Sequence, residues 1–146
     1  MTFTEDIRDR ADELHQAILI HPFVTGIGDG SLGMDRFKYF IRQDYLFLIE
    51  YCRVLALAVA KSPSLEYMGR FGGILNETLN TEMALHRDYC SRLGITQAEL
   101  ETTEPSPTML AYTNFLVRIA YHGSFGELTC ALLPCMWGYC EIGLNL

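Results

Sequence analysis

A thiol and a carboxylate are the side chains of this 146-residue sequence best suited to chemistry. The thiol is Cys135, which directly follows Pro134 in a stretch from Leu128 to Cys140 that holds no charged residue. Because proline cannot donate a backbone hydrogen bond and its ring displaces the carbonyl four residues earlier, we expect the helix to break or kink there. If a new helical segment begins at Pro134, its first turn favours the nucleophilic thiolate of Cys135. The alternative is a cysteine that only fills space at the kink.

The carboxylate is Asp44, whose neighbours one helical turn away are all apolar: Phe40, Ile41, Phe47 and Leu48. An unpaired carboxylate in such a setting costs several kcal/mol or takes up a proton, so we expect it to meet a partner or a ligand. One alternative is a salt bridge with an arginine of another helix. The other is a ligand anchor, because a carboxylate can bind the N–C–NH₂ edge of an aminopyrimidine with two hydrogen bonds, as it binds a guanidinium group.

Several tyrosines accompany these two groups. Tyr139 is four residues after Cys135, so the phenol and the thiol share one helical face. Tyr112 lies on a predicted helical face with Leu116 and Ile119, where packing in the core is the usual role of a tyrosine. The same type of side chain also suits a pocket that stacks a flat heterocycle and offers hydroxyl groups at its edge. Both interpretations stay open from the sequence.

Two further patterns predict structure rather than chemistry. Glu82 and His86 are one turn apart, but the spacing is Glu-x-x-x-His and there is no second copy, so we predict an ordinary intrahelical pair and no metal site. The glycine-rich segment from Gly26 to Gly30 has no preceding strand and no following lysine, so phosphate binding is not expected.

Helical periodicity dominates the chain, and no segment alternates with period two for long enough to form a strand. The predicted fold class is therefore all-α, one domain over residues 1–146, with antiparallel helices joined by short loops. Thr4 is the expected cap of the first helix, and His21-Pro22 its end, before a glycine-rich loop. Its inward stripe is predicted to be Ile7, Ala11, Leu14 and Ile18. Further helices are expected from Asp35 to about Lys61, from Ser62-Pro63 to Leu93, from Thr108 to Tyr121 and from Ser124 to Gly143, with a short capped turn at Thr96–Glu99.

Composition excludes several classes of protein. The 49% hydrophobic and 20% charged residues fit a globular domain. The net charge of -7 disfavours nucleic acid as a partner, and no apolar run reaches the length of a membrane span. The acidic N-terminus lacks the basic start of a secretion signal. Five scattered cysteines, an odd number without a Cys-x-x-Cys pair, predict reduced thiols in the cytoplasm.

A set of short motifs occurs in order along the whole chain: His21-Pro22-Phe23-Val24, Gly26-Ile27-Gly28-Asp29-Gly30, Phe37-Lys38-Tyr39, Gln43-Asp44, Glu82-Met83-Ala84-Leu85-His86, Pro105-Ser106-Pro107-Thr108, Tyr112-Thr113 and Leu132-Leu133-Pro134-Cys135. Together they resemble the TenA family, the thiaminase II or aminopyrimidine aminohydrolases of thiamin salvage. The resemblance implies a haem-oxygenase-like helical bundle that assembles as a homotetramer and uses no metal or organic cofactor.

The resemblance also implies a reaction. In the family, 4-amino-5-aminomethyl-2-methylpyrimidine is hydrolysed to the 5-hydroxymethyl compound with release of ammonia, and thiamin is cleaved by the same route. The position of Cys135 is the nucleophile that adds to the pyrimidine ring. The position of Asp44 anchors the aminopyrimidine edge, and the positions of Tyr112 and Tyr139 line the ring pocket.

This chain departs from the family pattern in two places. Phe47 stands where the family usually has a tyrosine that helps to activate the cysteine. The family also continues past Leu146, so we expect this chain to hold roughly the N-terminal two thirds of the fold, without the later helices and their acid–base glutamate. The alternative function is therefore a catalytically weak pyrimidine-binding protein or a regulatory helical protein.

Overall fold

The computed structural model describes residues 2–146, and these residues form helices and no strand, which confirms the all-α prediction. Most of the helices expected from periodicity are present, with additional short ones between them. In chain order the elements are α1 (Phe3–Leu19), α2 (Pro22–Gly28), α3 (Met34–Lys61), α4 (Leu65–Glu77), the π-helix η1 (Thr78–Glu82), α5 (Met83–Arg92), α6 (Gln97–Glu101), α7 (Pro107–His122) and α8 (Phe125–Asn145).

The chain divides into two compact units. One unit holds the described residues up to Gly33 together with Leu133–Leu146. The other is Met34–Leu132, which contains α3 to α7 and the beginning of α8. The single-domain assignment made from the sequence stays a prediction.

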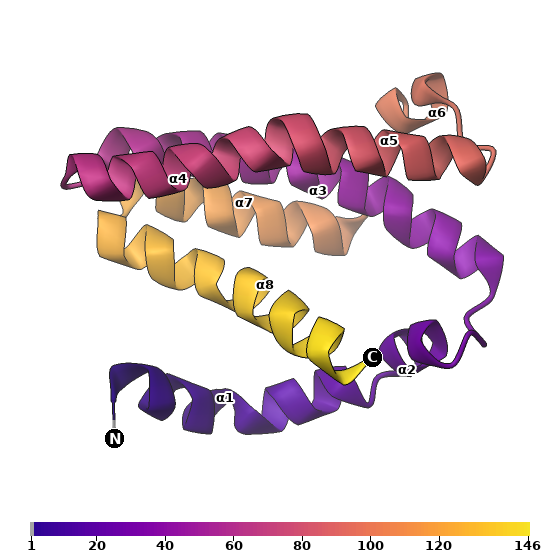
Figure 1. The fold of residues 1–146 in the computed structure, drawn as a ribbon, viewed down its shortest axis with the longest axis horizontal. Helices are drawn as coiled ribbons and strands as arrows, with labels where there is room; N and C mark the ends of the chain where they lie inside the picture. Colours follow the sequence, from indigo (N-terminus) through magenta and orange to yellow (C-terminus); the bar gives the residue numbers. More distant parts are fainter. Residues whose placement is uncertain (1) are drawn as a thin grey trace. The chain divides into compact units, whose positions relative to one another are not determined.

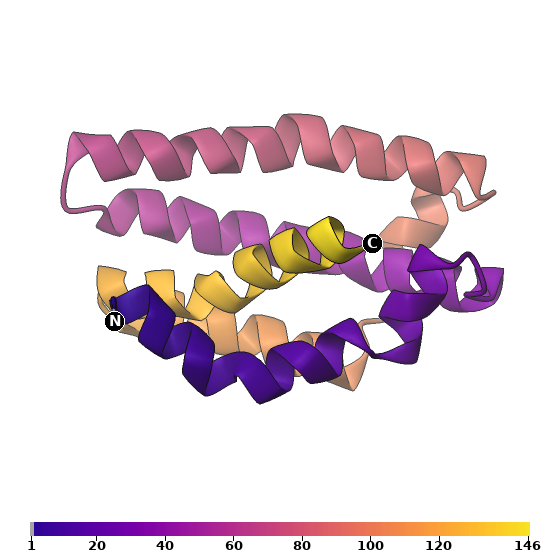
Figure 2. The same ribbon diagram turned by 60° about the horizontal axis from the view of Figure 1, so that its bottom comes forward.

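Helix α3 is the centre of the larger unit, and Figure 2 shows it lying beside the long helical run of α4, η1 and α5. Apolar residues face its neighbours on more than one side, so α3 contributes to two clusters of buried side chains. One cluster joins α3 to α7 and the start of α8: Tyr51, Val54, Leu55, Ala58, Leu116, Ala120, Leu128 and Leu132. The other joins α3 to α5 and α6: Ile41, Tyr45, Leu48, Met83, Cys90, Ile95 and Leu100.

The π-helix η1 sets which face of α5 meets α3. A π turn carries one more residue than an α turn, so it shifts the inward positions of the helix that follows. The inward side chains run from Thr78 to Met83, a step of five, and then to His86 and Cys90, and all four are buried. The sequence predicted one uninterrupted helix here, and the run is indeed continuous, but the π turn places His86 against α3.

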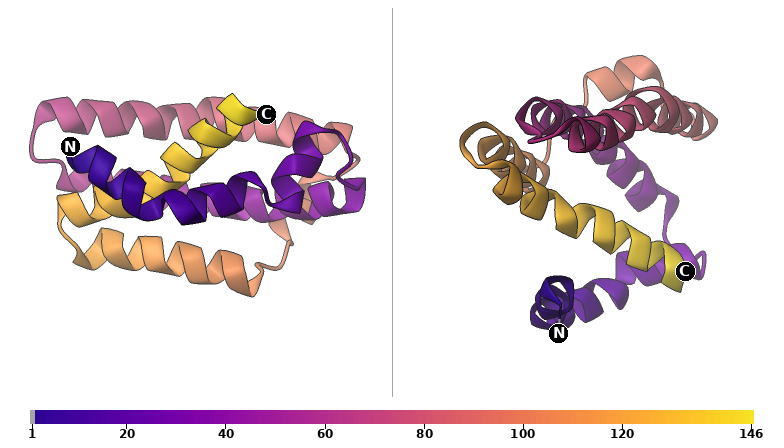
Figure 3. Two further views of the ribbon diagram at one scale, coloured as in Figure 1. Left: turned by 90° about the horizontal axis from the view of Figure 1, so that it is seen from below. Right: turned by 60° about the vertical axis from the view of Figure 1, so that its left-hand side comes forward.

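The smaller unit contains α1, α2 and the end of α8. The end of α8 approaches α2 closely at Gly28. A Cβ added to this glycine would lie only 2.6 Å from Leu146 Cδ2, so a larger residue there would require the Leu146 side chain to move. In Figure 3 the yellow C-terminal end of α8 accordingly lies beside α2. The predicted inward stripe of α1 is only partly correct. Ile7 and Ala11 are half-buried, but Leu14 and Ile18 are exposed.

Three predictions about helix starts need correction: one at α1, one at α2 and one at α4. The segment after His21 is not a loop, because the His21 side chain caps α2 by accepting a hydrogen bond from the Phe23 N–H, with Pro22 at the first helical position. Thr2 rather than Thr4 caps α1. Ser64 caps α4, so this helix begins after the Ser62-Pro63 start that the sequence predicted.

Other predicted helix ends are confirmed. Thr96 and Glu99 form the expected capping box at the start of α6, each side chain accepting from the other's backbone N–H. Gly94 has φ +74, the left-handed conformation that lets the chain leave α5. Figure 1 shows α6 as a short separate piece after this turn, and α7 then runs back along α3.

Candidate functional site

Asp44 lies in the middle of α3 and is paired with His86 of α5. The distance between Asp44 Oδ2 and His86 Nε2 is 3.4 Å, and the aspartate side chain is 22% exposed. The predicted need for a partner is met, but by a histidine rather than an arginine. The spacing of Glu82 and His86 predicted that these two residues pair with each other. In the structure His86 pairs with Asp44 instead, because α5 packs its His86 face against α3.

His86 is enclosed by three different kinds of group. Its side chain is 8% exposed, and its ring lies 5.9 Å from the ring of Tyr45. Its Nδ1 atom is 3.6 Å from Cys90 Sγ, one turn further along α5. Its Nε2 atom is buried and makes no hydrogen bond within residues 2–146, so its contact with Asp44 is an ion-pair approach without hydrogen-bond geometry.

The thiol of Cys90 is kept in its neutral form by its surroundings. The residue is fully buried, and burial raises the pKa of the Cys90 thiol above its usual range. The Arg42 guanidinium lowers this pKa in part, while the Asp44 carboxylate raises it further. The Cys90 side chain therefore carries its proton at neutral pH and can donate it to an acceptor.

Tyr112 of α7 stacks on Phe47 of α3. The two ring centroids are 5.6 Å apart and the ring planes differ by 2°. Phe47 in turn stacks on Tyr51 at 5.6 Å and 22°. Tyr112 is 36% exposed, so it lies at the edge of the packed interior, and its role in packing or in a pocket stays a prediction. Phe47 is three residues after Asp44 on the same helix, about one turn away. A shared pocket of Asp44 and Tyr112 stays a prediction.

Cys135 and Tyr139 lie on α8, which continues through Pro134 as a single helix. The helix is therefore not broken at the proline, and Cys135 is not in the first turn of a new helix, so a helix N-terminus does not favour its thiolate. A kink at Pro134, the other outcome expected from the sequence, stays a prediction. Cys135 is half-buried, and Tyr139 is 55% exposed. The two residues share a helix one turn apart, as predicted. The convergence of this pair with Asp44 and Tyr112 stays a prediction.

The part of α8 that carries these residues is held to α1 by a polar network. Glu141 accepts a hydrogen bond from Trp137 Nε1 at 2.8 Å and lies 3.1 Å from both Arg8 and His15. The Glu141 side chain is 17% exposed, so this is a half-buried cluster. His15, to which the sequence assigned no role, therefore helps to fix this end of α8.

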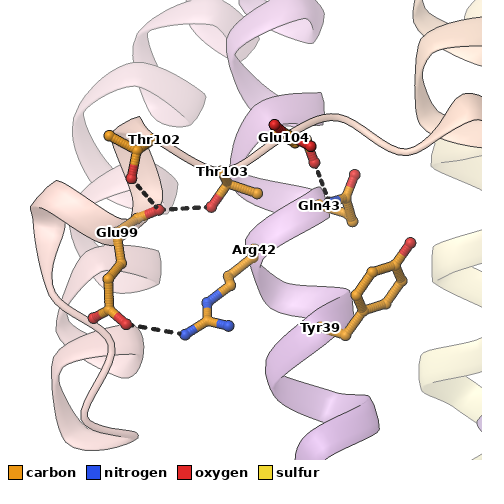
Figure 4. Close-up of a pocket in the computed structure, with 7 residues that line it drawn as sticks. All are labelled: Tyr39, Arg42, Gln43, Glu99, Thr102, Thr103 and Glu104. Carbon is orange, nitrogen blue, oxygen red and sulfur yellow. Dashed lines mark hydrogen bonds and ion pairs between the residues drawn. The ribbon is translucent and has the colours of Figure 1, made fainter.

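A cavity of about 350 Å³ lies between α3 and the connection from α6 to α7 (Figure 4). Gln43 ties that connection to α3, because its Nε2 donates to the Glu104 carbonyl and its Oε1 accepts from the Ser106 N–H. Arg42 pairs with Glu99 at 3.3 Å. The lining residues are Tyr39, Arg42, Gln43, Glu99, Thr102, Thr103 and Glu104, so neither Asp44 nor Tyr112 belongs to this cavity.

Within residues 2–146, no three side chains of the metal-ligating types are grouped so that they could hold an ion. No helix in that range is both long enough and apolar enough to span a bilayer.

His86 and Cys90 are the residues of this region that the sequence analysis did not connect with Asp44. Their i, i+4 spacing marks a shared helical face, but which helix that face meets depends on the π turn before it. Sequence spacing alone therefore does not identify Asp44 as their neighbour.

Known proteins that match this chain belong to the family that its motifs resemble. The TENA/THI-4/PQQC family model matches residues 8–146. An aminopyrimidine aminohydrolase of Halalkalibacterium halodurans is 47% identical over 146 residues, which are 100% of this chain and 65% of that protein. One of Bacillus subtilis is 40% identical over 146 residues, again 100% of this chain and 62% of that protein. The chain thus spans less than two thirds of the length of these two relatives.

A solved structure gives the same result for the fold. The crystal structure of a TenA family transcription regulator from Silicibacter sp. TM1040 matches with a TM-score of 0.93 and 38% identity, covering 96% of this chain and 62% of that one. The predicted haem-oxygenase-like helical fold is confirmed.

Proposed function

The chain belongs to the TENA/THI-4/PQQC family, and from that premise we propose that it acts in thiamin salvage as an aminopyrimidine aminohydrolase. The proposed reaction converts 4-amino-5-aminomethyl-2-methylpyrimidine and water into the 5-hydroxymethyl compound and ammonia, with thiamin as a further substrate cleaved by the same route. The observation that carries this proposal is the unbroken similarity of the whole chain to two proteins of that name.

Cys135 is the proposed nucleophile. Its thiolate adds to the pyrimidine ring, forming a carbon–sulfur bond and breaking the aromaticity of the ring. The electron pair of the adduct then expels the amine from the exocyclic methylene, and the amine leaves as ammonia after taking up a proton. Water adds to that methylene and loses a proton, the carbon–sulfur bond breaks, and the ring becomes aromatic again with Cys135 released.

Asp44 is the proposed anchor for the substrate. Its carboxylate accepts one hydrogen bond from the exocyclic amino group and one from the neighbouring ring nitrogen in its protonated form, the bidentate arrangement that a carboxylate also makes with a guanidinium group. The partial exposure of Asp44 supports this role, because a ligand can reach the group. Tyr112 and Tyr139, both partly exposed residues, are proposed to line the pocket around the pyrimidine.

One observation favours a second candidate function, a pyrimidine-binding protein with weak turnover. Phe47 carries no hydroxyl, whereas the family resemblance implies a tyrosine at this position that helps to activate the cysteine. A missing acid–base partner lowers the rate by about 10² or more while leaving ligand binding intact.

The enzyme is proposed to work without a metal or organic cofactor, in the cytoplasm, where five scattered cysteines stay reduced. It is proposed to be a homotetramer, and the exposed apolar side chains on its helices, such as Leu65 and Leu144, support association. Nucleic acid is not a proposed partner, because the net charge is -7.

Ammonia release from the aminomethylpyrimidine tests the proposal. Cys135→Ala should abolish release while calorimetry with the hydroxymethyl product still detects binding. Cys140→Ala is the matched control, since it removes an exposed thiol from the same helix and should leave turnover unchanged. Turnover by Cys135→Ala at the wild-type rate would overturn the nucleophile. Product binding without any turnover by the wild type would support the pyrimidine-binding function instead.

A further inference from the structure

We propose that His86 is a positioning residue for Asp44, and that Cys90 fixes the tautomer of His86 that this role requires. Through its Nε2–H, the imidazole faces one oxygen of the carboxylate and sets the orientation in which Asp44 meets its ligand. This inference rests on the proposed function, because it takes Asp44 as the group that binds the pyrimidine edge.

The first step is the arrangement of three side chains in a row. Cys90 Sγ is 3.6 Å from His86 Nδ1, and His86 Nε2 is 3.4 Å from Asp44 Oδ2. Cys90 is fully buried, His86 is 8% exposed at its side chain and Asp44 is 22% exposed. The row therefore runs from the core to a partly open carboxylate, with the imidazole between a thiol and an acid.

The second step is the position of the proton on the imidazole. The raised pKa of the Cys90 thiol keeps its proton on sulfur at neutral pH, so the thiol can donate to Nδ1 across the 3.6 Å contact, and this is the direction that the proposal assigns to their hydrogen bond. A neutral imidazole carries one N–H, and with Nδ1 accepting, that N–H must be on Nε2. The proton on Nε2 then faces the Asp44 carboxylate.

The third step concerns what keeps the imidazole in place. The Tyr45 ring lies 5.9 Å from it, and Tyr45 is itself buried, so the imidazole packs against a buried ring. The π turn that precedes α5 fixes the helical face on which His86 and Cys90 lie. The imidazole is thus held by packing on one side and by the thiol on another.

The fourth step is that Asp44 keeps its capacity for a ligand. A carboxylate has about four lone-pair sites, so one contact on Oδ2 leaves both sites of Oδ1 and one of Oδ2. Both oxygens remain available to the two donors of an aminopyrimidine edge. At the observed 3.4 Å, Nε2 and Oδ2 are not aligned as a hydrogen bond among residues 2–146, so a small turn of the carboxylate as it meets its ligand would align them.

A role limited to packing predicts something different. A histidine that only fills the core lowers stability when it is replaced but does not separate ligand affinity from turnover. A positioning residue acts through Asp44, so its loss raises KM and the dissociation constant for the hydroxymethyl product and leaves kcat nearly unchanged. Rescue by a side chain that places a donor at the position of Nε2 is a second signature.

The test compares His86→Gln with His86→Asn in the full chain. The amide nitrogen of glutamine reaches about as far as imidazole Nε2, whereas that of asparagine reaches only about as far as Nδ1. We expect His86→Asn to raise KM and the product dissociation constant about tenfold, the effect of losing a hydrogen bond to a charged group. We expect His86→Gln to stay within about threefold of the wild type. Melting temperatures of both variants control for folding.

A nitrogen NMR measurement tests the tautomer without relying on activity. In protein labelled with ¹⁵N-histidine, the His86 signals, identified by their loss in His86→Asn, should show a protonated Nε2 and a bare Nδ1. Cys90→Ser keeps a donor next to Nδ1 and should preserve this pattern, whereas Cys90→Ala should not. A proton on Nδ1 in the wild type would overturn the inference.

The binding results distinguish this inference from the proposed function. If the wild type binds the product and His86→Asn binds it with equal affinity, the positioning role alone is overturned. Equal losses in His86→Gln and His86→Asn, or a loss of kcat without a change of KM, also overturn it. A wild type that neither binds the product nor releases ammonia overturns the proposed function and the positioning role with it.

Discussion

Phe47 and Tyr112 stack with nearly parallel rings, their planes 2° apart, and this contact joins the helix of Asp44 to α7. Phe47 also stacks on Tyr51, so three aromatic rings form a continuous column in the larger unit. The column fixes the ring of Phe47 but offers no hydroxyl at that position. It therefore supplies stacking without the acid–base group that the family resemblance implies there.

The first prediction concerns that missing hydroxyl. Phe47→Tyr keeps the ring in the column and adds the phenol, so kcat for ammonia release should rise about 10², the usual contribution of one acid–base partner. Steady-state kinetics with the aminomethylpyrimidine measures it. Phe47→Leu is the control, because it keeps an apolar side chain without ring or hydroxyl and should not raise kcat. An unchanged kcat in Phe47→Tyr would show that this position does not limit turnover.

The second prediction concerns Pro134 inside α8. Replacing it with alanine restores a backbone N–H that can donate to the carbonyl of Cys130, so the free energy of unfolding should rise by about 1–3 kcal/mol. Thermal and denaturant unfolding measure this change. Gly138→Ala is the matched control on the same helix, where an added Cβ meets nothing within 4 Å, and should gain about 1 kcal/mol from helix propensity alone. A Pro134→Ala variant less stable than the wild type would show that the surrounding structure depends on the proline ring.

Activity adds a separate outcome to the same variant. If the ring of Pro134 sets the path of the helix at Cys135, Pro134→Ala should lower kcat while it raises stability. A rise in stability with unchanged kcat would mean that Cys135 is positioned by the rest of α8 and not by the proline.

The third prediction is a pH dependence at the start of α8. The Ser124 backbone N–H donates to Glu127 Oε2 at 2.7 Å, and with the Ser124 hydroxyl it lowers the pKa of Glu127 below its ordinary value of 4.5. Because the unfolded chain takes up this proton first, the stabilisation is complete above pH 4.5 and is lost as the pH falls through the folded-state pKa.

Glu127→Gln tests that dependence. It should lower the melting temperature at neutral pH by a few degrees, since it removes a charged cap from the first helical turn. The difference from the wild type should shrink as the pH falls below 4.5, where the wild-type carboxylate also becomes neutral. Melting curves at several pH values measure it, and a difference that stays constant down to the acid range would contradict the assignment.

Residue patterns alone were enough to predict the helical character of the chain, several of its helix ends and its family. These follow from local rules: Thr96 and Glu99 are three residues apart, so the capping box needs only its own turn. The glycine-rich segment shows where local rules stop. Gly26 and Gly28 suggested a loop, yet His21 caps a helix there and Gly28 packs against Leu146, a contact that spans the length of the chain.

The partner of Asp44 could be identified only from the packing of the helices. The apolar face around this residue predicted that a partner must exist, because an unpaired carboxylate there is costly. Its identity depended on α5 packing beside α3 and on the π turn that shifts the face of α5, and neither is encoded by spacing near Asp44. The same holds for Pro134, where the helix continues through the proline although local backbone chemistry disfavours it. Hydrogen bonds within one helical turn can be predicted from neighbouring residues. Contacts between distant residues form only when whole helices pack, so they cannot be predicted in this way.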